Sequence, residues 1–121
     1  MQNQNSFIDY PKPDVVYIDV DGTLLIGDQV NHELVSWARQ QFSSGKQIIV
    51  WSARGEHNAR RAVELCGISD IVLHALSKPG YVVDDLGAGF TRYMEIIHVG
   101  DIDRSRSDQA NNQPRVQVSF I

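Results

Sequence analysis

Short apolar runs alternate with segments of helical periodicity, and this alternation limits the fold more than any other feature. Residues 15–20, 47–53 and 70–76 are rich in aliphatic and branched side chains, as expected of strands buried on both faces. Between them, residues 31–44 and 56–66 place apolar side chains at helical spacing. Strands connected through single helices pair in parallel. The sequence therefore predicts an α/β protein with a three-layer α/β/α, Rossmann-like fold and a mainly parallel sheet.

Four further segments complete the predicted layout. Residues 24–30 place Gly27-Asp28 between short apolar flanks, a pattern typical of a tight hairpin. Residues 80–85 are predicted to form a fourth strand and residues 95–99 a fifth, while residues 86–93 fit either a loop or a helix. The link between the third and fourth strands is too short for a helix, so this crossover is atypical.

The length of 121 residues fits one domain, which we place at residues 14–121 after an extended lead-in at residues 1–13. Residues 103–114 are polar and lack periodicity, which predicts a loop. The alternating residues 115–121 predict a half-exposed terminal strand that pairs with its own sheet or with a partner. Both a monomer, in which this strand joins its own sheet, and a homo-oligomer, in which it pairs with a second copy, therefore stay open.

Composition excludes several classes of protein. No apolar run approaches the length of a membrane span and the N-terminus lacks a signal-peptide pattern, so we expect a cytoplasmic protein without a membrane partner. Cys66 is the only cysteine, which rules out an intrachain disulfide and favours an inert core thiol. The net charge of −4 argues against general nucleic-acid binding. Nucleic acid is expected only as a phosphorylated substrate.

Polar and charged side chains follow each predicted strand at the point where it ends. In chain order they are Asp19 and Asp21, then Ser52 and Arg54, then Lys78, then Asp84 and Asp85. Ligands of open parallel sheets bind at the carboxyl ends of the strands, so these side chains should meet at one edge. Asp21-Gly22 alone would fit a solvated turn equally well. The second acidic pair favours a functional site.

The chemistry of this set points to phosphate. Four carboxylates at one edge would repel one another, and a divalent cation removes the conflict. Oxygen ligands without His or Cys favour a hard ion such as Mg²⁺. The Ser52 hydroxyl and the Lys78 ammonium would bind phosphoryl oxygens. Together these groups indicate phosphoryl transfer through an aspartyl-phosphate.

The same residues carry a family resemblance. The run Asp19-Val20-Asp21-Gly22-Thr23-Leu24 resembles the first motif of the haloacid dehalogenase superfamily, whose commonest members are Mg²⁺-dependent phosphatases. Ser52 resembles the second motif, Lys78 the third, and Asp84-Asp85 the fourth, all in the family's order. The resemblance implies the superfamily's fold and an enzyme of the phosphoric monoester hydrolase class.

The resemblance also implies a role for each residue. Asp19 is the expected nucleophile, and Asp21 the acid that protonates the leaving oxygen and then the base that activates water. Ser52 and Lys78 are expected to hold phosphoryl oxygens, and Gly22 and Thr23 are further expected substrate contacts. Arg54 is a substrate contact by its position, because it follows the same strand end as Ser52 and could clamp a second anionic group. The expected Mg²⁺ ligands are Asp19, Asp21 through its backbone carbonyl, and Asp84 or Asp85.

The intervals between motifs are too short for the cap domain that many family members carry, so the chain resembles a small capless phosphatase. The substrate stays open among small phosphomonoesters, nucleotides and polynucleotide 3′-phosphates. The last is suggested by a Ser-x-Arg stretch that is similar to one in polynucleotide kinase-phosphatases. Two rival hypotheses are a phosphoacceptor regulatory domain and an inactive binding protein of the same superfamily. Regulatory domains place the accepting aspartate on a later strand, which argues against the first rival.

Overall fold

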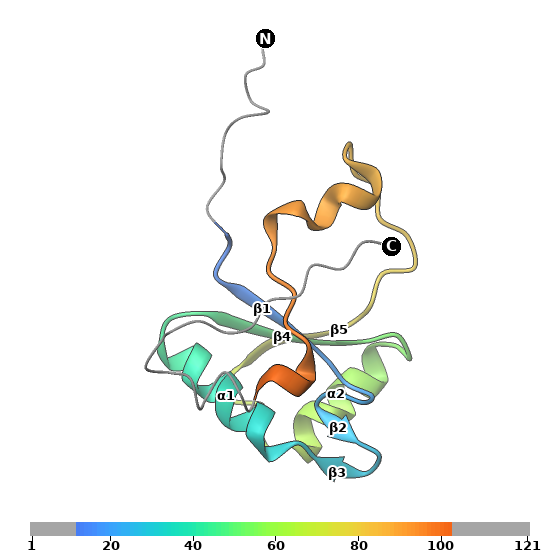
Figure 1. Ribbon diagram of the computed structural model, residues 1–121. Coiled ribbons are helices and arrows are strands. Elements are labelled where there is room, and N and C mark those ends of the chain that lie inside the picture. Colours follow the sequence, from blue (N-terminus) through green and yellow to red (C-terminus); the bar gives the residue numbers. More distant parts are fainter. Residues whose placement is uncertain (1–11, 103–121) are drawn as a thin grey trace.

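Three parallel strands in the order β1-β4-β5 form the centre of the computed structural model, which describes residues 12–102 (Figure 1). The strands are β1 (Val15–Asp19), β4 (Gln47–Ser52) and β5 (Val72–Ser77). Asp19 pairs with Trp51 and Ser52 with Ser77, so the carboxyl ends of the three strands lie level at one edge of the sheet. We call this the carboxyl edge. The predicted loop 103–114 and terminal strand 115–121 lie outside the described residues.

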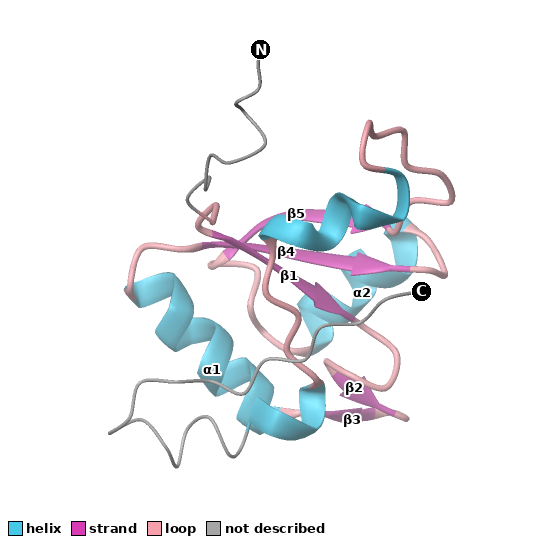
Figure 2. Cartoon of the chain, turned by 45° about the horizontal axis from the view of Figure 1, so that its top comes forward, coloured by secondary structure: helices cyan, strands magenta, loops and turns pink. Residues whose placement is uncertain are grey.

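Two α-helices connect these strands and lie on one face of the sheet (Figures 1 and 2). Helix α1 (His32–Ser43) joins β1 to β4 through a short hairpin, and α2 (Glu56–Leu65) joins β4 to β5. Strand order advances in one direction, so two crossovers of the same hand must place both helices on the same side. The predicted α/β class with a parallel sheet is confirmed. On the opposite face, the described chain places the 3₁₀-helix η2 (Gly87–Tyr93) rather than an α-helical layer.

The core lies between the sheet and its two helices. It contains Ile18 of β1, Val20 directly after β1, and Ile48 and Val50 of β4, together with the helix residues Leu34, Trp37, Ala38, Ala59, Ala62 and Val63. The strand residues alternate along β1 and β4, and the helix residues recur at helical spacing, as amphipathic elements require. The two predicted helices are thus confirmed, with Leu34, Trp37 and Ala38 buried on α1 and Ala59, Ala62 and Val63 on α2, while Phe42 is 45% exposed.

The predicted hairpin is also confirmed. Strands β2 (Leu25–Ile26) and β3 (Gln29–Val30) pair antiparallel, with Leu25 opposite Val30. Leu24 and Leu25 are buried in the core and attach the hairpin to the body of the molecule. The side chain of Asn31 caps α1 by accepting a hydrogen bond from the Leu34 N–H at 3.2 Å.

Two predicted strands are wrong. Residues 80–85 form an exposed irregular segment, with Tyr81 95% and Val83 100% exposed. A parallel strand after β5 would need a crossover of about a dozen residues, and the chain between Ser77 and Gly80 is far shorter. Residues 95–98 are irregular as well, and the 3₁₀-helix η3 (Val99–Asp101) follows them. Ile97 and Val99 pack against the core, so this apolar pattern reflects burial without strand pairing.

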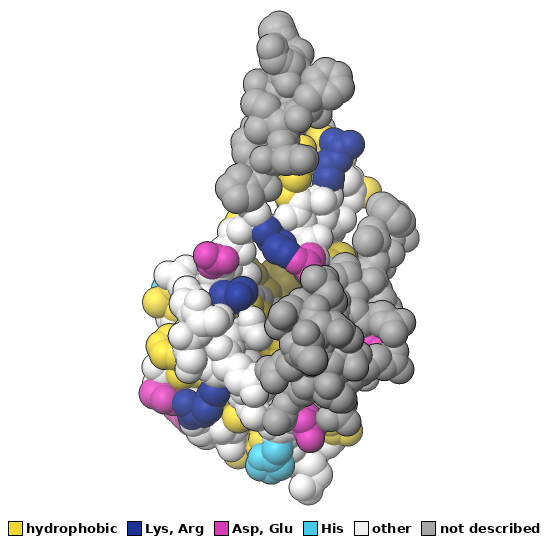
Figure 3. Space-filling model, turned by 60° about the vertical axis from the view of Figure 1, so that its left-hand side comes forward, with side chains coloured by type: hydrophobic (Ala, Val, Ile, Leu, Met, Phe, Trp, Pro, Cys, Tyr) yellow, Lys and Arg dark blue, Asp and Glu magenta, His cyan; other side chains and the backbone are white. Residues whose placement is uncertain are grey.

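On the side that carries α1, acidic and basic side chains are scattered among polar ones, and the visible part of the described chain shows no extended basic patch (Figure 3). No helix within residues 12–102 is both long and apolar enough to cross a membrane.

Candidate active site at the carboxyl edge of the sheet

Asp19 ends β1 and points to the carboxyl edge, where two side chains hold its carboxylate. The Lys78 Nζ lies 3.2 Å from Oδ1, and the Thr23 hydroxyl donates a hydrogen bond to Oδ2 at 3.2 Å. The Asp19 side chain remains 32% exposed, so a ligand can reach it. Asp19 and Lys78, which the sequence places at the ends of two different strands, thus contact each other.

Lys78 reaches Asp19 across the end of the middle strand. Its ammonium lies 5.9 Å from the ring centroid of Trp51, which in turn packs on Tyr17 with ring centroids 4.7 Å apart. A cation over an aromatic face is attracted by the ring's electron density. The backbone N–H of Lys78 donates to the carbonyl of Ser52 at 2.9 Å. These contacts fix the lysine at the edge instead of leaving it in a solvated turn.

The turn after β1 brings Thr23 back onto Asp19. The N–H groups of Thr23 and Leu25 both donate to the Val20 carbonyl, at 3.0 Å each. Gly22 has a φ of +80°, which only glycine adopts without strain, and its missing side chain lets the chain reverse at once. The structure thus places both Gly22 and Thr23 beside Asp19, with the Thr23 hydroxyl already bonded to it.

Asp21 lies on the side of α2, where two other residues hold it. The Arg54 Nη1 lies 3.1 Å from Oδ1, and the Asn58 side-chain amide donates to Oδ2 at 3.2 Å. The Asp21 side chain is 49% exposed. The two aspartates therefore have different partners, a lysine for Asp19 and an arginine with an amide for Asp21.

Ser52 is the buried link between these two groups. Its hydroxyl oxygen accepts hydrogen bonds from the Arg54 N–H at 3.0 Å and the Asn58 amide at 2.9 Å. Its carbonyl accepts from the N–H groups of Gly55 and Lys78. The residue is 0% exposed, so in this structure Ser52 positions its neighbours and does not face solvent.

Asn58 belongs to the site and was missed by the sequence reasoning. It is buried, and its one amide nitrogen contacts both Ser52 and Asp21. A signal existed in the sequence: Asn58 lies four residues before Ala62, on the stripe that α2 buries. A polar side chain at such a position needs a hydrogen-bond partner, and here it has two.

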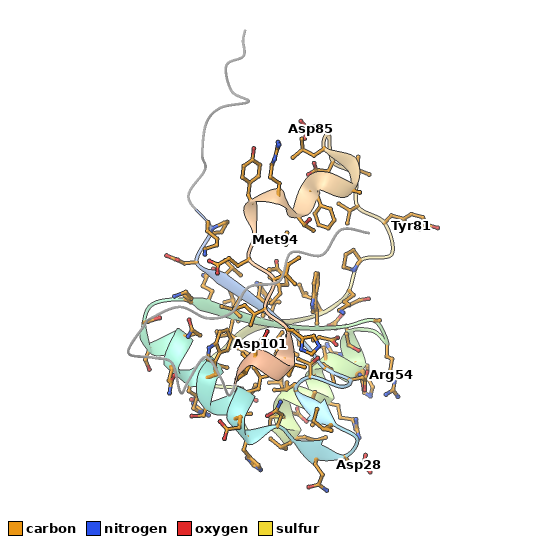
Figure 4. All side chains as sticks on the ribbon, in the orientation of Figure 1. Asp28, Arg54, Tyr81, Asp85, Met94 and Asp101 are labelled. Atoms are coloured by element: carbon orange, nitrogen blue, oxygen red, sulfur yellow. The ribbon has the colours of Figure 1, made fainter. Side chains whose placement is uncertain are left out.

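The structure does not bring Asp84 and Asp85 to the carboxyl edge. Both lie on the exposed segment after β5, and Figure 4 shows Asp85 well away from Arg54. Asp84 shapes the turn into η2, because its Oδ1 accepts the Leu86 N–H at 2.8 Å and its carbonyl accepts the Gly87 N–H. The predicted strand that would have aimed this pair at the edge is absent, so their predicted metal role loses its geometric basis.

The predicted Mg²⁺ site consequently does not fit as a set. Within residues 12–102, no three or more His, Cys, Asp or Glu side chains are grouped so that they could hold a metal ion. Of the four predicted ligands, only Asp19 and Asp21 follow β1 at the carboxyl edge.

Asp101 is a second residue that the sequence reasoning passed over. It ends η3 and is 8% exposed, and it is the one carboxylate classed as buried in the described part of the chain. Figure 4 shows it within the body of the molecule, next to the buried Ile102 in sequence. The signal was a short run, residues 96–99, that is apolar except for His98 and precedes Gly-Asp, much as the run of β1 ends in Asp19.

The fold and the site define an α/β protein with a parallel sheet whose carboxyl edge carries an aspartate–lysine pair and a second aspartate held by an arginine and an asparagine. Comparison of the chain with protein-family models, curated proteins and solved structures finds no match.

Proposed function

We propose that this chain hydrolyses phosphomonoesters through an aspartyl-phosphate formed on Asp19. One observation carries the proposal: the partly exposed Asp19 carboxylate lies 3.2 Å from the Lys78 ammonium at the carboxyl edge of a parallel sheet. A carboxylate is a nucleophile towards phosphorus, and an adjacent cation attracts the phosphoryl dianion and stabilises charge during transfer. The carboxyl edge is also where open parallel sheets bind ligands.

In the first step, an Asp19 carboxylate oxygen bonds to phosphorus while the bond from phosphorus to the leaving oxygen breaks. Asp21 supplies the proton that the leaving oxygen takes up. In the second step, Asp21 accepts a proton from water, whose oxygen bonds to phosphorus. The bond to Asp19 then breaks, inorganic phosphate leaves, and both aspartates return to their starting states.

The neighbours of Asp21 fix the orientation of its side chain. Arg54 and Asn58 hold one carboxylate oxygen each, so the group has a fixed orientation beside the nucleophile's strand. Proton transfer needs a group within hydrogen-bond reach of the reacting oxygen, and a fixed orientation favours such reach. Buried Ser52 connects this group to the backbone of Lys78.

We also propose that the activity depends on Mg²⁺, and the experiment below tests this point separately from the role of Asp19. A bound divalent ion would neutralise phosphoryl charge. Because the described residues do not assemble the four predicted carboxylates, the steps above are assigned to Asp19, Asp21 and Lys78 alone.

The decisive experiment measures hydrolysis of p-nitrophenyl phosphate, with and without Mg²⁺, by wild type, Asp19→Asn and Asp14→Asn. Asp14 lies one residue before β1, so it is a matched control at the opposite end of the strand. We expect Asp14→Asn to retain activity and Asp19→Asn to lose about 10³-fold or more. Equal activity in all three proteins would overturn the nucleophile assignment.

Phosphoenzyme lifetime separates the hydrolase from a phosphoacceptor domain. Acid quenching followed by mass spectrometry should find a phosphoryl group on Asp19 that turns over within the reaction. A long-lived adduct would favour the regulatory rival. No hydrolysis of any phosphomonoester by a folded wild-type protein would favour the inactive binding protein.

A further inference from the structure

A groove of about 670 Å³ separates the β2–β3 hairpin from α2. Leu25, Gly27 and Asp28 line it on the hairpin side, and His57, Asn58, Arg61 and Leu65 line it on the helix side, with Asp21 and Arg54 also in the lining. Figures 1 and 4 show the hairpin beside α2, with Asp28 near the hairpin end and Arg54 near the carboxyl edge. The groove therefore connects the candidate site with the surface of α2.

The position of Asp21 indicates what the groove holds. Asp21 lines the groove, whereas Asp19 is not part of its lining. In the proposed reaction Asp21 protonates the leaving oxygen, so the leaving group must lie next to Asp21. The groove is the space next to Asp21, and it therefore receives the leaving group.

The helix side of the groove carries two arginines, of which Arg54 is paired with Asp21 and Arg61 is not paired within the described residues. Arg61 is exposed and forms no hydrogen bond or ion pair with any residue from 12 to 102. His57 lies one turn earlier on α2, four residues before Arg61 and hence on the same helix face. Arg54 uses only Nη1 to bind Asp21, which leaves its other guanidinium nitrogens to a ligand.

The two sides of the groove differ in charge. The first turn of α2 contains Glu56, which pairs with Arg60 outside the groove lining, so the helix side owes its positive charge to Arg54 and Arg61. The acidic side chain opposite them, Asp28, lies on the hairpin. An anion in the groove is thus favoured along α2 and disfavoured at the hairpin.

We propose that the α2 side of this groove binds a second phosphoryl group, carried by the leaving group of the substrate, through Arg54, His57 and Arg61. The inference rests on the proposed hydrolase function and names its substrate class, a phosphomonoester with a second phosphate. Guanidinium groups suit this task because their paired N–H donors match phosphate oxygens.

The test compares substrates that differ only in the second phosphate. The pairs are thymidine 3′-monophosphate with thymidine 3′,5′-bisphosphate, and fructose 6-phosphate with fructose 1,6-bisphosphate. Wild type should prefer a bisphosphate by about ten-fold in kcat/KM, the scale of one charge-assisted contact at an exposed site. A preference within the first pair alone assigns the second phosphate to a nucleotide, and within the second pair alone to a sugar.

Arg61→Ala and Arg60→Ala give a matched comparison. Both remove one positive charge from α2, but Arg60 pairs with Glu56 and does not line the groove. Arg61→Ala should abolish the preference for the bisphosphate, while Arg60→Ala should preserve it. Equal losses in the two variants, or no preference in wild type, would overturn the proposal.

Binding to Asp19→Asn separates this inference from the proposed function. Calorimetric titration with each member of the two pairs should show tighter binding of a bisphosphate that depends on Arg61 but not on Arg60. If wild type hydrolyses nothing yet this pattern appears, the groove assignment stands and the hydrolase proposal fails. If hydrolysis occurs without the pattern, the hydrolase proposal stands and the groove assignment fails.

Discussion

Asn58 and Ser52 are both buried, and the Asn58 amide nitrogen lies 2.9 Å from the Ser52 hydroxyl oxygen. The same nitrogen lies 3.2 Å from Oδ2 of Asp21, so one side chain couples the end of β4 to the proposed acid–base residue. Holding Asp21 from the buried side leaves its other oxygen to Arg54 and the groove. This coupling makes Asn58 a positioning residue whose loss should affect proton transfer.

Asn58→Ala should lower stability and change leaving-group dependence. Loss of a donor to buried Ser52 should cost about 1 to 3 kcal/mol in the free energy of unfolding, measured by urea titration. Hydrolysis of an alkyl phosphate, whose leaving oxygen must be protonated, should fall about ten-fold more than hydrolysis of p-nitrophenyl phosphate. Equal losses on both substrates would mean that Asn58 acts on the fold alone.

Lys78→Met should reduce hydrolysis by about 10² to 10³-fold, because it removes the only positive charge that the described residues place within ion-pair distance of Asp19. Lys78→Arg keeps the charge but changes its shape, and should retain an intermediate rate. The control is Lys46→Met, since Lys46 is a lysine whose ammonium contacts only the Ser44 hydroxyl among the described residues. Comparable losses at positions 46 and 78 would point to overall charge as the cause.

The sequence predicted most of the sheet and both helices because local signals specify them. Asn31 caps α1, and the stripe containing Ala59, Ala62 and Val63 identifies the buried face of α2. Residues 80–85 misled because a β-branched run reports β-propensity but not a pairing partner. The short link after Ser77 argued against this strand, because a parallel crossover needs about a dozen residues.

Part of the candidate site could likewise be predicted from the sequence. Asp19 and Lys78 follow strands of one parallel sheet, so position alone places them at the carboxyl edge. The buried stripe of α2 indicates that Asn58 needs a hydrogen-bond partner, but that this partner is Asp21 depends on how α2 packs. The predicted Mg²⁺-binding role of Asp84 and Asp85 required residues 80–85 to form a strand that ends at the carboxyl edge, and this strand is absent.

Asp85→Asn should leave hydrolysis of p-nitrophenyl phosphate within about two-fold of wild type at saturating Mg²⁺, since the structure places Asp85 on an exposed segment away from Arg54. Asp21→Asn serves as the comparison and should lose activity strongly. A loss at Asp85 as large as that at Asp21 would show that the segment closes onto the carboxyl edge in the working protein.

A pH-dependent contribution to stability is expected from Arg39 and Asp70. Arg39 donates to both Asp70 carboxylate oxygens, at 2.9 and 3.1 Å, and to the Gly67 carbonyl at 2.8 Å. The hydrogen bond from Arg39 lowers the pKa of Asp70. A lowered pKa in the folded state stabilises the protein above the carboxyl group's ordinary pKa of about 3.9, and the benefit disappears as pH falls through the lower, folded value.

Asp70→Asn should therefore lower Tm slightly at pH 7, because the pair is exposed and salt screens it. The difference from wild type should shrink below about pH 4 and vanish in stronger acid, where Asp70 is protonated in both states. Thermal melts from pH 2 to pH 7, at low and high salt, measure this. A Tm difference that stays constant across the acidic range would assign the effect to the Gly67 contact.

Cys66 should be a slow thiol in the folded protein. It packs partly against the core, and burial raises the pKa of its thiol. Because the thiolate is the reactive form, alkylation by iodoacetamide at pH 7 should be about ten-fold slower than in the unfolded chain.

The alkylation rate should keep rising as the pH passes the ordinary thiol pKa of about 8.5. As the chain has a single cysteine, mass spectrometry of the labelled fraction against time reports this site alone. Equal rates in buffer and in denaturant would contradict its burial beside α2.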